Sequence, residues 1–251
     1  RRGTLHGRIK PLAPHMAVAG PAITVEVRPG DNLAIHAAMA VAKPGDVLVI
    51  DGKGDLSCAL LGEIMATQAQ ASGIAGIVID GAVRDAETLS KQRFPVFAAG
   101  LNPCGPTKFI PGRVNHAISV GGAAVQAGDL VVGDIDGVVV IPRDEVRTII
   151  ELAKGKLEME SKRLVAIRDG DLRPHWLESA QRRGDTAMSA KKVILITGSD
   201  LADAALGMLE DYELVFAGRQ PTEAQLIALC QQHNPVAILV RYGHITAAVM
   251  D

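Results

Sequence analysis

The stretch "IAGIVIDGAVRDAET", residues 74–88, joins a continuous apolar run to a charged loop. The run from Ile74 to Asp80 has the composition of a strand that is buried on both faces. Arg84 and Asp85 follow it, where the chain leaves that strand. Binding groups are common in such loops, because a rigid sheet holds them while the loop exposes them. Taken alone, these residues fit a binding site and a solvated turn with an incidental ion pair equally well.

The sequence around this stretch alternates strand and helix patterns. A short strand and a turn are expected in "AITVEVRPGDN" (residues 22–32), and buried or short strands in "VLVIDG" (47–52) and "FPVFAAG" (94–100). "LAIHAAMAVAKPGD" (33–46) is typical of a helix that ends in a turn. "DLSCALLGEIMATQAQASG" (55–73) has helical spacing, a possible cap at Asp55 or Ser57 and a stop at Gly73. This alternation indicates an α/β fold.

The pattern changes twice further along the chain. "HAISVGGAAVQAGDLVVGDIDGVVVIP" (116–142) has short β runs broken by Gly-Asp turns, which favours a more antiparallel layer. An amphipathic helix is expected from about residue 143 to 168. After residue 188 the order strand–helix–strand–helix–strand predicts an incomplete doubly wound, flavodoxin-like βαβαβ segment. We therefore expect two domains, residues 1–187 and 188–251, and the opening "RRGTLHGRIKPL" indicates a truncated N-terminus for the first.

The bulk composition excludes several classes of protein. A chain of 251 residues is long enough for one large domain or two small ones. Its net charge of −2 gives no general footprint for nucleic acid or an anionic membrane, so neither is expected as a partner. No apolar run approaches the roughly 20 residues that span a bilayer. The cysteines are far apart and form no CxxC pair, which fits a reducing cytoplasm; they are Cys58, Cys104 and Cys230.

One constellation of residues carries chemistry. If the helix in residues 55–73 effectively begins near Gly62, its unpaired backbone N–H groups form an anion site, and the glycine lets a carboxylate approach them closely. Arg84 would add a planar fork for a carboxylate or keto oxygen. Asp85 would be a hard oxygen ligand for Mg²⁺ or Mn²⁺. Together these residues predict a site for a small 2-oxo acid chelated to a divalent cation.

The segment "LLGEIMATQAQASGIAGIVIDGAVRD" (60–85) resembles the signature of the RraA-like family. "GRIKPL", "AGPAITV", "PGDVLVIDG", "FPVFAAG" and "GDLVVGDIDGVVVIP" occur in the expected order, so the similarity runs from residue 1 to about 180. That family includes class II pyruvate aldolases acting on 4-hydroxy-4-methyl-2-oxoglutarate and 4-carboxy-4-hydroxy-2-oxoadipate, and regulators of ribonuclease activity. The resemblance implies a layered β/β/α swivelling-domain architecture, assembled as a homotrimer or a hexamer of two trimers.

The resemblance also implies roles for single residues. The backbone of Gly62, Glu63, Ile64 and Met65 would bind the pyruvyl group together with Arg84, and Asp85 would hold the metal, partly through water. The family usually has an acidic residue three positions after the aspartate, where this chain has Thr88. In the aldolases a further acidic side chain comes from a neighbouring subunit.

The implied reaction is the retro-aldol cleavage of a 4-hydroxy-2-oxo acid. The metal and Arg84 would draw electrons from the 2-oxo group, so that the C3–C4 bond breaks to leave a pyruvate enolate. The same stabilisation would decarboxylate oxaloacetate. A base, either a metal-ordered water or another group, takes the C4 hydroxyl proton.

Other readings of these residues remain open. His36 and His116 are candidate proton carriers, and either is also compatible with a structural role. Lys53 and Lys108 are interpreted as surface or carboxylate-binding residues, since no Schiff base is required. Cys104 lies in a loop that could close near the site. The competing function is a regulator of ribonuclease activity that works by protein contact, and Arg84 with Asp85 favours the enzyme.

The segment after residue 188 resembles the first half of the substrate domain of a D-2-hydroxyacid dehydrogenase. About 60 residues match, and the resemblance would place substrate contacts at Arg241 to Gly243. The GxGxxG loop that binds a dinucleotide does not follow, so a dehydrogenase activity is not supported. Met188 directly before the new pattern indicates an internal start, and hence a fusion of neighbouring reading frames.

Overall fold

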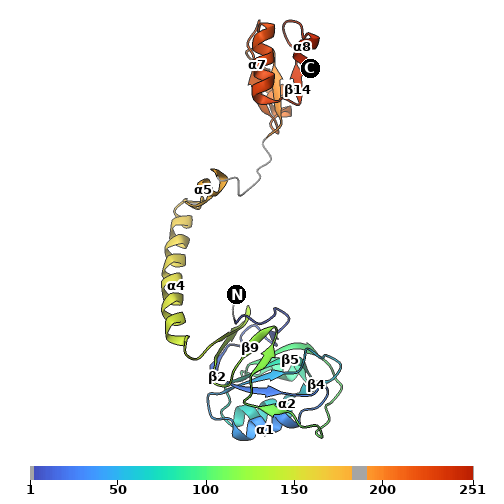
Figure 1. Cartoon of the computed structure of the whole chain (residues 1–251), viewed down its shortest axis with the longest axis vertical. Helices are drawn as coiled ribbons and strands as arrows, with labels where there is room; N and C mark the ends of the chain where they lie inside the picture. Colours follow the sequence, from blue (N-terminus) through green and yellow to red (C-terminus); the bar gives the residue numbers. More distant parts are fainter. Residues whose placement is uncertain (1–2, 183–190, 251) are drawn as a thin grey trace. The chain divides into compact units, whose positions relative to one another are not determined.

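The computed structural model describes residues 3–182 and 191–250, and its contacts divide the chain into two units, residues 1–166 and 167–251. The predicted domain boundary at residues 187 and 188 lies outside the described residues, so it stays a prediction. The first unit is a mixed α/β fold built on one large sheet, and the second contains a small parallel sheet (Figure 1). Within the described residues, no helix has the length and apolarity needed to cross a bilayer.

The large sheet has nine strands, with parallel strands at its centre and antiparallel strands at both flanks. Strand β5 pairs in parallel with β3 and β6, and β3 pairs in parallel with β2. The order along the sheet is β1-β6-β5-β3-β2-β10-β11, with β4 beside β5 and β7 beside β2. The strands are β1 (Lys10–Pro11), β2 (Val18–Glu26), β3 (Val47–Asp51), β4 (Ala59–Leu61), β5 (Gly76–Val83), β6 (Val96–Leu101), β7 (Arg113–Val114), β10 (Leu130–Asp134) and β11 (Gly137–Ile141).

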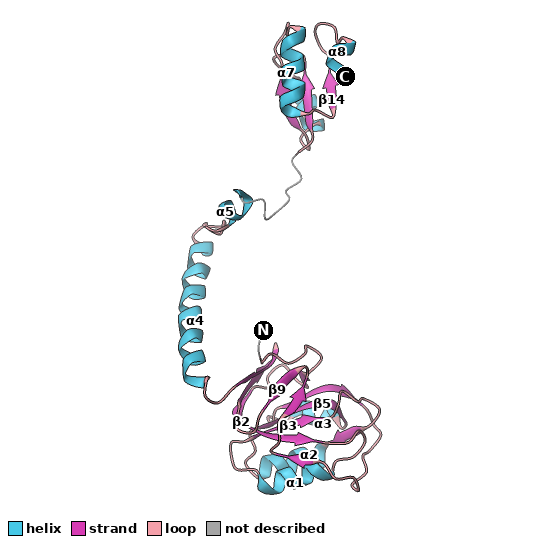
Figure 2. Cartoon of the chain, in the orientation of Figure 1, coloured by secondary structure: helices cyan, strands magenta, loops and turns pink. Residues whose placement is uncertain are grey.

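Each face of this sheet is covered, which explains why the central strands read as continuous apolar runs. Alternate residues of β3 point to opposite faces, so Leu48 and Ile50 join one core while Val47 and Val49 join the other. The first core includes residues of the helices α1 (Leu33–Val41), α2 (Glu63–Ala71) and α3 (Ala86–Lys91). The second includes the antiparallel pair β8 (Ile118–Val120) and β9 (Ala123–Val125). Figure 2 shows α1 and α2 on one side of the sheet and β9 on the other.

The helix expected over residues 55–73 is wrong in its first half. Residues 59–61 form β4, which pairs with β5 through Ala59↔Ala82 and Leu61↔Val83. The leucines that fit a helical spacing are instead buried as strand residues, since pairing with β5 satisfies their backbone while their side chains fill the core. Asp55 accepts a hydrogen bond from the Ser57 N–H, which makes a turn rather than a helix cap. The helix itself starts at Glu63 and stops before Gly73, whose φ is +79°.

The expected long helix is α4 (Val146–Arg168), and none of its residues is buried among those the structure describes. A short α5 (Leu177–Arg182) follows. The later part of the chain forms the predicted parallel three-stranded sheet, in the order β13-β12-β14. Its elements are β12 (Val193–Ile196), α6 (Asp203–Met208), β13 (Glu213–Phe216), α7 (Glu223–His233), β14 (Ala237–Leu239) and α8 (Ala247–Met250).

Candidate functional site

Arg84 and Asp85 stand at the carboxyl end of β5, as the sequence predicts. The Arg84 N–H donates to the carbonyl of Leu61 at 3.0 Å, so the ladder between β4 and β5 continues up to the arginine. Asp85 precedes α3 and has a left-handed backbone, with φ +59° and ψ +34°. A non-glycine residue in this region is uncommon, and such conformations concentrate at functional sites. The local backbone thus exposes the Arg84 and Asp85 side chains at the carboxyl end of a central strand of the sheet.

The first turn of α2 faces the same two side chains. Asp85 Oδ2 accepts a hydrogen bond from the Glu63 N–H at 2.9 Å, and it lies 3.7 Å from Arg84 Nε. A Cβ on Gly62 would lie 2.3 Å from Asp85 Oδ2 and 2.8 Å from Arg84 Cγ, so only glycine allows this approach. The amides of Ile64 and Met65 also belong to this first turn and have no partner inside the helix. The predicted site residues are therefore brought together.

These residues contribute to the site through different groups. The Ile64 side chain is 78% exposed, whereas that of Met65 is buried in the core. The Arg84 and Asp85 side chains are 43% and 40% exposed. The segment from Gly62 to Met65 therefore offers backbone amides, and the loop after β5 offers a guanidinium and a carboxylate.

A cavity of about 260 Å³ lies against this segment. One wall contains Gly62, Ile64, Met65 and Arg84, as the sequence predicts. The rest of the lining comes from the start of α1 and from the loop after β6; its polar residues are Asn32, His36 and Lys108. A second hollow, of about 350 Å³, lies where Arg84 and Asp85 face Asn102 and Pro103.

Two buried polar atoms in this cavity wall lack a hydrogen-bond partner among the described residues. They are Oδ1 of Asn32, whose amide nitrogen donates to the Leu60 carbonyl at 2.9 Å, and Nε2 of His36. Burial and the nearby charge of Lys108 lower the pKa of His36 from its usual value. Because buried polar atoms are normally paired, the two orphans indicate that a polar ligand completes this wall.

Asn32 was missed by the sequence reasoning, and His36 was one of two histidine candidates. The signal that could have found the pair is their spacing of four residues at the start of one amphipathic helix, which puts both on one face. His116 lies elsewhere, near Glu26, where its charge lowers that carboxyl's pKa as a smaller contribution after the hydrogen bond from Lys53. Lys108 is exposed and lines the cavity, a position that suits either a surface or a carboxylate-binding residue.

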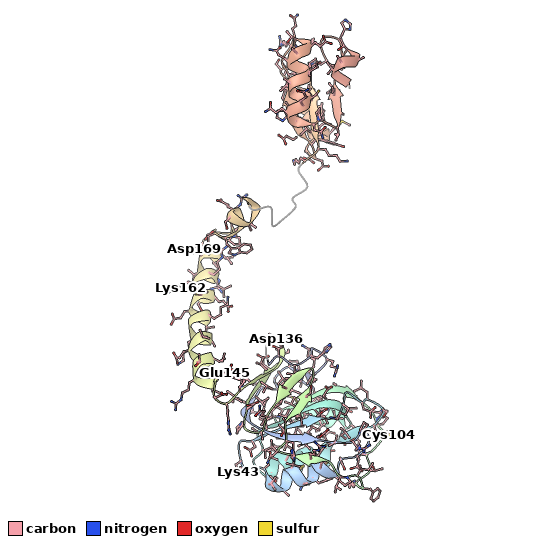
Figure 3. The ribbon with its side chains drawn as sticks, in the orientation of Figure 1. Lys43, Cys104, Asp136, Glu145, Lys162 and Asp169 are labelled. Carbon is pink, nitrogen blue, oxygen red and sulfur yellow. The ribbon has the colours of Figure 1, made fainter. Side chains whose placement is uncertain are left out.

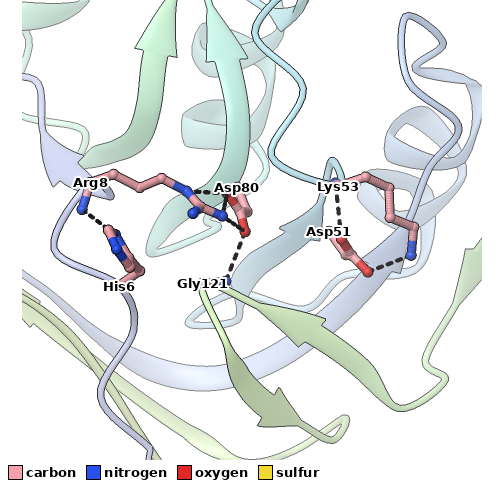
Figure 4. A network of polar contacts seen from close by, with 6 residues as sticks. All are labelled: His6, Arg8, Asp51, Lys53, Asp80 and Gly121. Atoms are coloured by element: carbon pink, nitrogen blue, oxygen red, sulfur yellow. Dashed lines mark hydrogen bonds and ion pairs between the residues drawn. The ribbon is translucent and has the colours of Figure 1, made fainter.

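Lys53 is a structural residue in this fold. Its Nζ donates to Asp51 Oδ2 at 2.6 Å (Figure 4) and to Glu26 Oε1 at 2.9 Å, and these hydrogen bonds raise the pKa of the lysine. In a second network, Arg8 donates hydrogen bonds to both carboxylate oxygens of Asp80. The Lys53 network joins the ends of β2 and β3, whereas the Arg8 network joins Asp80 within β5 to the N-terminal segment; neither network lines the 260 Å³ cavity.

The residues at Asp85 fit a magnesium-type ion better than a zinc-type ion. Among the described residues, no group of three or more histidine, cysteine, aspartate or glutamate side chains could hold a metal. Mg²⁺ keeps several waters and often needs only one or two carboxylates plus substrate oxygens. Asp85 supplies such a carboxylate, since Oδ1 accepts no hydrogen bond from the described residues. The donor set therefore suits a hard cation that is completed by water and an oxo acid.

Comparisons with known proteins agree with this geometry. Residues 1–140 match the family model described as "RraA-like: Aldolase/RraA". The chain is 44% identical over 165 residues to a Halalkalibacterium halodurans protein named "Putative 4-hydroxy-4-methyl-2-oxoglutarate aldolase", covering 66% of this chain and 79% of that one.

Two solved structures of similar fold carry names from RNA processing. The RNA-processing inhibitor RraA from Thermus thermophilis is 32% identical with a TM-score of 0.52, covering 55% of this chain and 84% of that one. Streptomyces coelicolor RraAS2, described as an unusual member of the RNase ES inhibitor RraA family, is 30% identical with a TM-score of 0.60. That match covers 66% of this chain and 85% of the Streptomyces chain.

Proposed function

The chain belongs to the RraA-like family, and on that premise we propose that it is a divalent-metal-dependent lyase of the pyruvate aldolase type. Its reaction is the retro-aldol cleavage of 4-hydroxy-4-methyl-2-oxoglutarate-type substrates to pyruvate, with oxaloacetate decarboxylation as a side activity. The observation that carries the proposal is the clustering of Arg84, Asp85 and the first turn of α2: Arg84 and that turn line one cavity, and Asp85 accepts a hydrogen bond from the same turn and lines the adjoining hollow with Arg84. As parts of the same proposal, the first unit is a layered β/β/α swivelling domain that assembles as a homotrimer or hexamer in the cytoplasm.

The pyruvyl end of the substrate binds at the first turn of α2. Its carboxylate accepts hydrogen bonds from the amides of Ile64 and Met65, where the positive end of the helix favours an anion. The Arg84 guanidinium reaches the carboxylate and the 2-oxo oxygen from the side of β5. Because these donors are held by the sheet and the helix before the substrate arrives, they stabilise the negative charge of an enolate without reorganisation.

Asp85 is the residue that would hold the divalent cation. A cation bound there supplies a Lewis acid that draws electron density from the 2-oxo group. Asp85 Oδ2 meanwhile keeps its hydrogen bond from Glu63, which fixes the direction of the carboxylate. Gly62 makes that contact sterically possible, so the metal ligand and the anion site depend on the same glycine.

Asn32, His36 and Lys108 of the cavity lining bind the part of the substrate beyond the C3–C4 bond. The C4 hydroxyl must lose its proton for the bond to break, and His36 has an unpartnered Nε2 in this wall. Its lowered pKa keeps the imidazole neutral and able to accept a proton near pH 7. Asn32 Oδ1 can accept a hydrogen bond from another donor group of the bound substrate, and Lys108 adds a positive charge for a distal carboxylate.

The second candidate is a regulator of ribonuclease activity that acts by binding protein. The 32% identity to the Thermus RNA-processing inhibitor supports it, as does Thr88, which stands where the family usually has an acid. A regulator of this kind has no need of a positioned carboxylate next to an anion site. The geometry of Arg84 and Asp85 therefore favours the lyase.

Pyruvate release distinguishes the two functions. We expect turnover of 4-hydroxy-4-methyl-2-oxoglutarate and of oxaloacetate with Mg²⁺, and its loss with EDTA. Arg84→Ala and Asp85→Ala should each lower kcat/KM by about a thousandfold, which is in the range for removing one group that stabilises the developing charge. Arg93→Ala and Asp136→Ala, at exposed positions outside the cavity, are the matched controls. A folded protein without turnover under any condition would favour the regulator, and a ribonuclease-binding assay would follow.

A further inference from the structure

Cys58 and Cys104 lie next to each other at the edge of the site. Cys58 precedes β4, and Cys104 lies in the loop after β6; Figure 3 labels Cys104 at the surface of the first unit. The Ala59 N–H donates to the Cys104 carbonyl at 2.9 Å, and Cys58 Sγ lies 3.5 Å from that same oxygen. The hydrogen bond from Ala59 brings the backbone next to Cys58 beside that of Cys104, and a disulfide requires such proximity, with Cα atoms about 4.4–6.8 Å apart.

Two further hydrogen bonds fasten these segments to each other. The Asn102 side chain donates through Nδ2 to the Leu56 carbonyl at 2.7 Å, and its Oδ1 accepts from the Cys104 N–H at 2.8 Å. The loop that carries Cys104 is thus attached to the segment that carries Cys58 on both sides of the thiols. Joining the two sulfur atoms therefore requires side-chain rotation and only a small adjustment of the backbone.

The two thiols differ in access. Cys104 is exposed, whereas Cys58 is 8% exposed. Burial, and then the neighbouring Cys104 thiol, raise the pKa of Cys58 above its usual value, so Cys58 stays protonated while Cys104 meets reagents from solvent. The third cysteine, Cys230, belongs to α7 in the second unit and serves as an internal control.

We propose that Cys58 and Cys104 are a modification site for hydroperoxides, which convert the pair into an intramolecular disulfide. The Cys104 sulfur attacks the peroxide, an S–O bond forms and the O–O bond breaks, leaving a sulfenic acid and an alcohol or water. The Cys58 sulfur then attacks the Cys104 sulfur. An S–S bond forms, the S–O bond breaks, and the leaving hydroxide takes the Cys58 proton as water. Two thiols are oxidised and one peroxide is reduced by two electrons.

The disulfide acts on the candidate site through the loop that follows Cys104. A Cβ on Gly105 would lie 2.9 Å from Arg84 Nη1, so the guanidinium rests against the backbone of that loop. Pro106 and Lys108 of the same loop line the 260 Å³ cavity. Forming the disulfide pulls Cys104 toward Cys58 and shifts the loop backbone at Gly105, against which the Arg84 guanidinium packs. If the proposed function holds, oxidation lowers pyruvate release by about tenfold or more, because small displacements of binding groups are costly.

The experiment treats the full chain with hydrogen peroxide and then blocks the remaining thiols with an alkylating reagent. Peptide mass spectrometry should find the Cys58 and Cys104 peptides joined, with the loss of two hydrogen atoms, and free again after dithiothreitol. Cys230→Ser should cross-link as the parent does, and Cys104→Ser should not. Pyruvate release is measured on the same samples, before oxidation, after oxidation and after reduction. Cys104→Ser avoids the packing change that a substitution of the buried Cys58 would bring.

The outcomes separate this inference from the proposed function. Cross-linking with a reversible fall in turnover, absent in Cys104→Ser, supports the inference. No Cys58–Cys104 linkage in a protein that oxidises elsewhere overturns it, and linkage with unchanged turnover overturns the connection to Arg84. Linkage in a protein that never releases pyruvate leaves the modification site standing and counts against the lyase alone.

Discussion

Strand β5 and its end carry two aspartates paired with arginines, and the two aspartates have opposite environments. Asp80 is 5% exposed, and its oxygens accept three hydrogen bonds of 2.8 to 3.0 Å from Arg8 and one from the Gly121 N–H. Asp85 is 40% exposed and lies 3.7 Å from Arg84. Both arginines are 43% exposed, so the same two residue types form a pair with a saturated aspartate inside the sheet and a pair with an open aspartate at its end.

The difference shows what makes such a pair a site. The donors around Asp80 come from the N-terminal segment and from the turn between β8 and β9, so the carboxylate ties three parts of the fold together. The Asp85 carboxylate instead touches a helix N-terminus and leaves one oxygen free. A carboxylate with spare bonding capacity can bind a cation while the unpaired amides beside it bind an anion, whereas a saturated carboxylate can only stabilise the fold.

Of the changes to these two pairs, removing Arg8 should lower the free energy of unfolding most. Arg8→Ala leaves the buried Asp80 without its cation, and we expect a loss of about 3–4 kcal/mol in the free energy of unfolding. Urea denaturation measures it. Arg84→Ala should cost less than about 1 kcal/mol, since its pair is half exposed. Equal losses in the two variants would contradict the assignment of one structural pair and one open pair.

Gly62→Ala tests the open pair from the helix side. The new Cβ would collide with Asp85 Oδ2 and Arg84 Cγ, at 2.3 and 2.8 Å, and must displace both side chains. We expect kcat/KM for pyruvate release to fall about a hundredfold, while the melting temperature changes little. The matched control is Gly155→Ala in α4, where a Cβ meets nothing within 4 Å. A fully active Gly62→Ala protein would show that the contact of Asp85 with α2 is dispensable.

Asp31 extends the comparison to a third carboxylate, which holds the cavity loop. Burial opposes its charge, but hydrogen bonds from Thr107, Leu33, Phe109 and Ile110 outweigh it and lower the pKa of Asp31 from 3.8 to about 2. Since the folded-state pKa is lowered, this stabilisation is present above about pH 4 and is lost as the pH falls toward 2.

Asp31→Asn should therefore cost about 2 kcal/mol of stability at pH 7, because hydrogen bonds to a charged acceptor are lost. The cost should shrink as the pH is lowered from 4 to 2. Thermal unfolding across that range measures both effects. A cost that does not depend on pH would mean that the charge of Asp31 does not hold the loop.

The smallest expected effect belongs to an ordinary surface pair. Lys91 and Glu87 on α3 are four residues apart, 2.7 Å between charged atoms and 72% and 86% exposed. Lys91→Ala should change the free energy of unfolding by about 0.5 kcal/mol or less and leave pyruvate release intact. Chemical denaturation in low and high salt checks it. A larger loss, or a fall in turnover, would show that charges on this helix matter to the site.

The sequence predicts the parts of this molecule that depend on local pattern. The buried strand before Arg84, the glycine stop of α2 and the parallel sheet after residue 190 follow from composition and spacing. β4 was mistaken for helix because its leucines fit a helical period, and only pairing with β5 decides otherwise. The spacing of Asn32 and His36 indicates a shared helix face, but neither the cavity that they line nor the Cys58–Cys104 contact is visible in the sequence, since both depend on segments brought together by the sheet.

Binding of oxalate, a planar mimic of the pyruvate enolate, measures whether Asp85 and a divalent cation form one site for an oxo acid. Calorimetric titration of the parent protein and of Asp85→Ala, each with Mg²⁺ and with EDTA, gives four affinities. We expect oxalate to bind the parent protein with Mg²⁺ at least about a hundredfold more tightly than in the other three conditions, as intermediate mimics bind sites built for charge development. Equal oxalate affinity with and without Mg²⁺, or in Asp85→Ala, would contradict the account of Arg84 and Asp85 as a metal–oxo acid site.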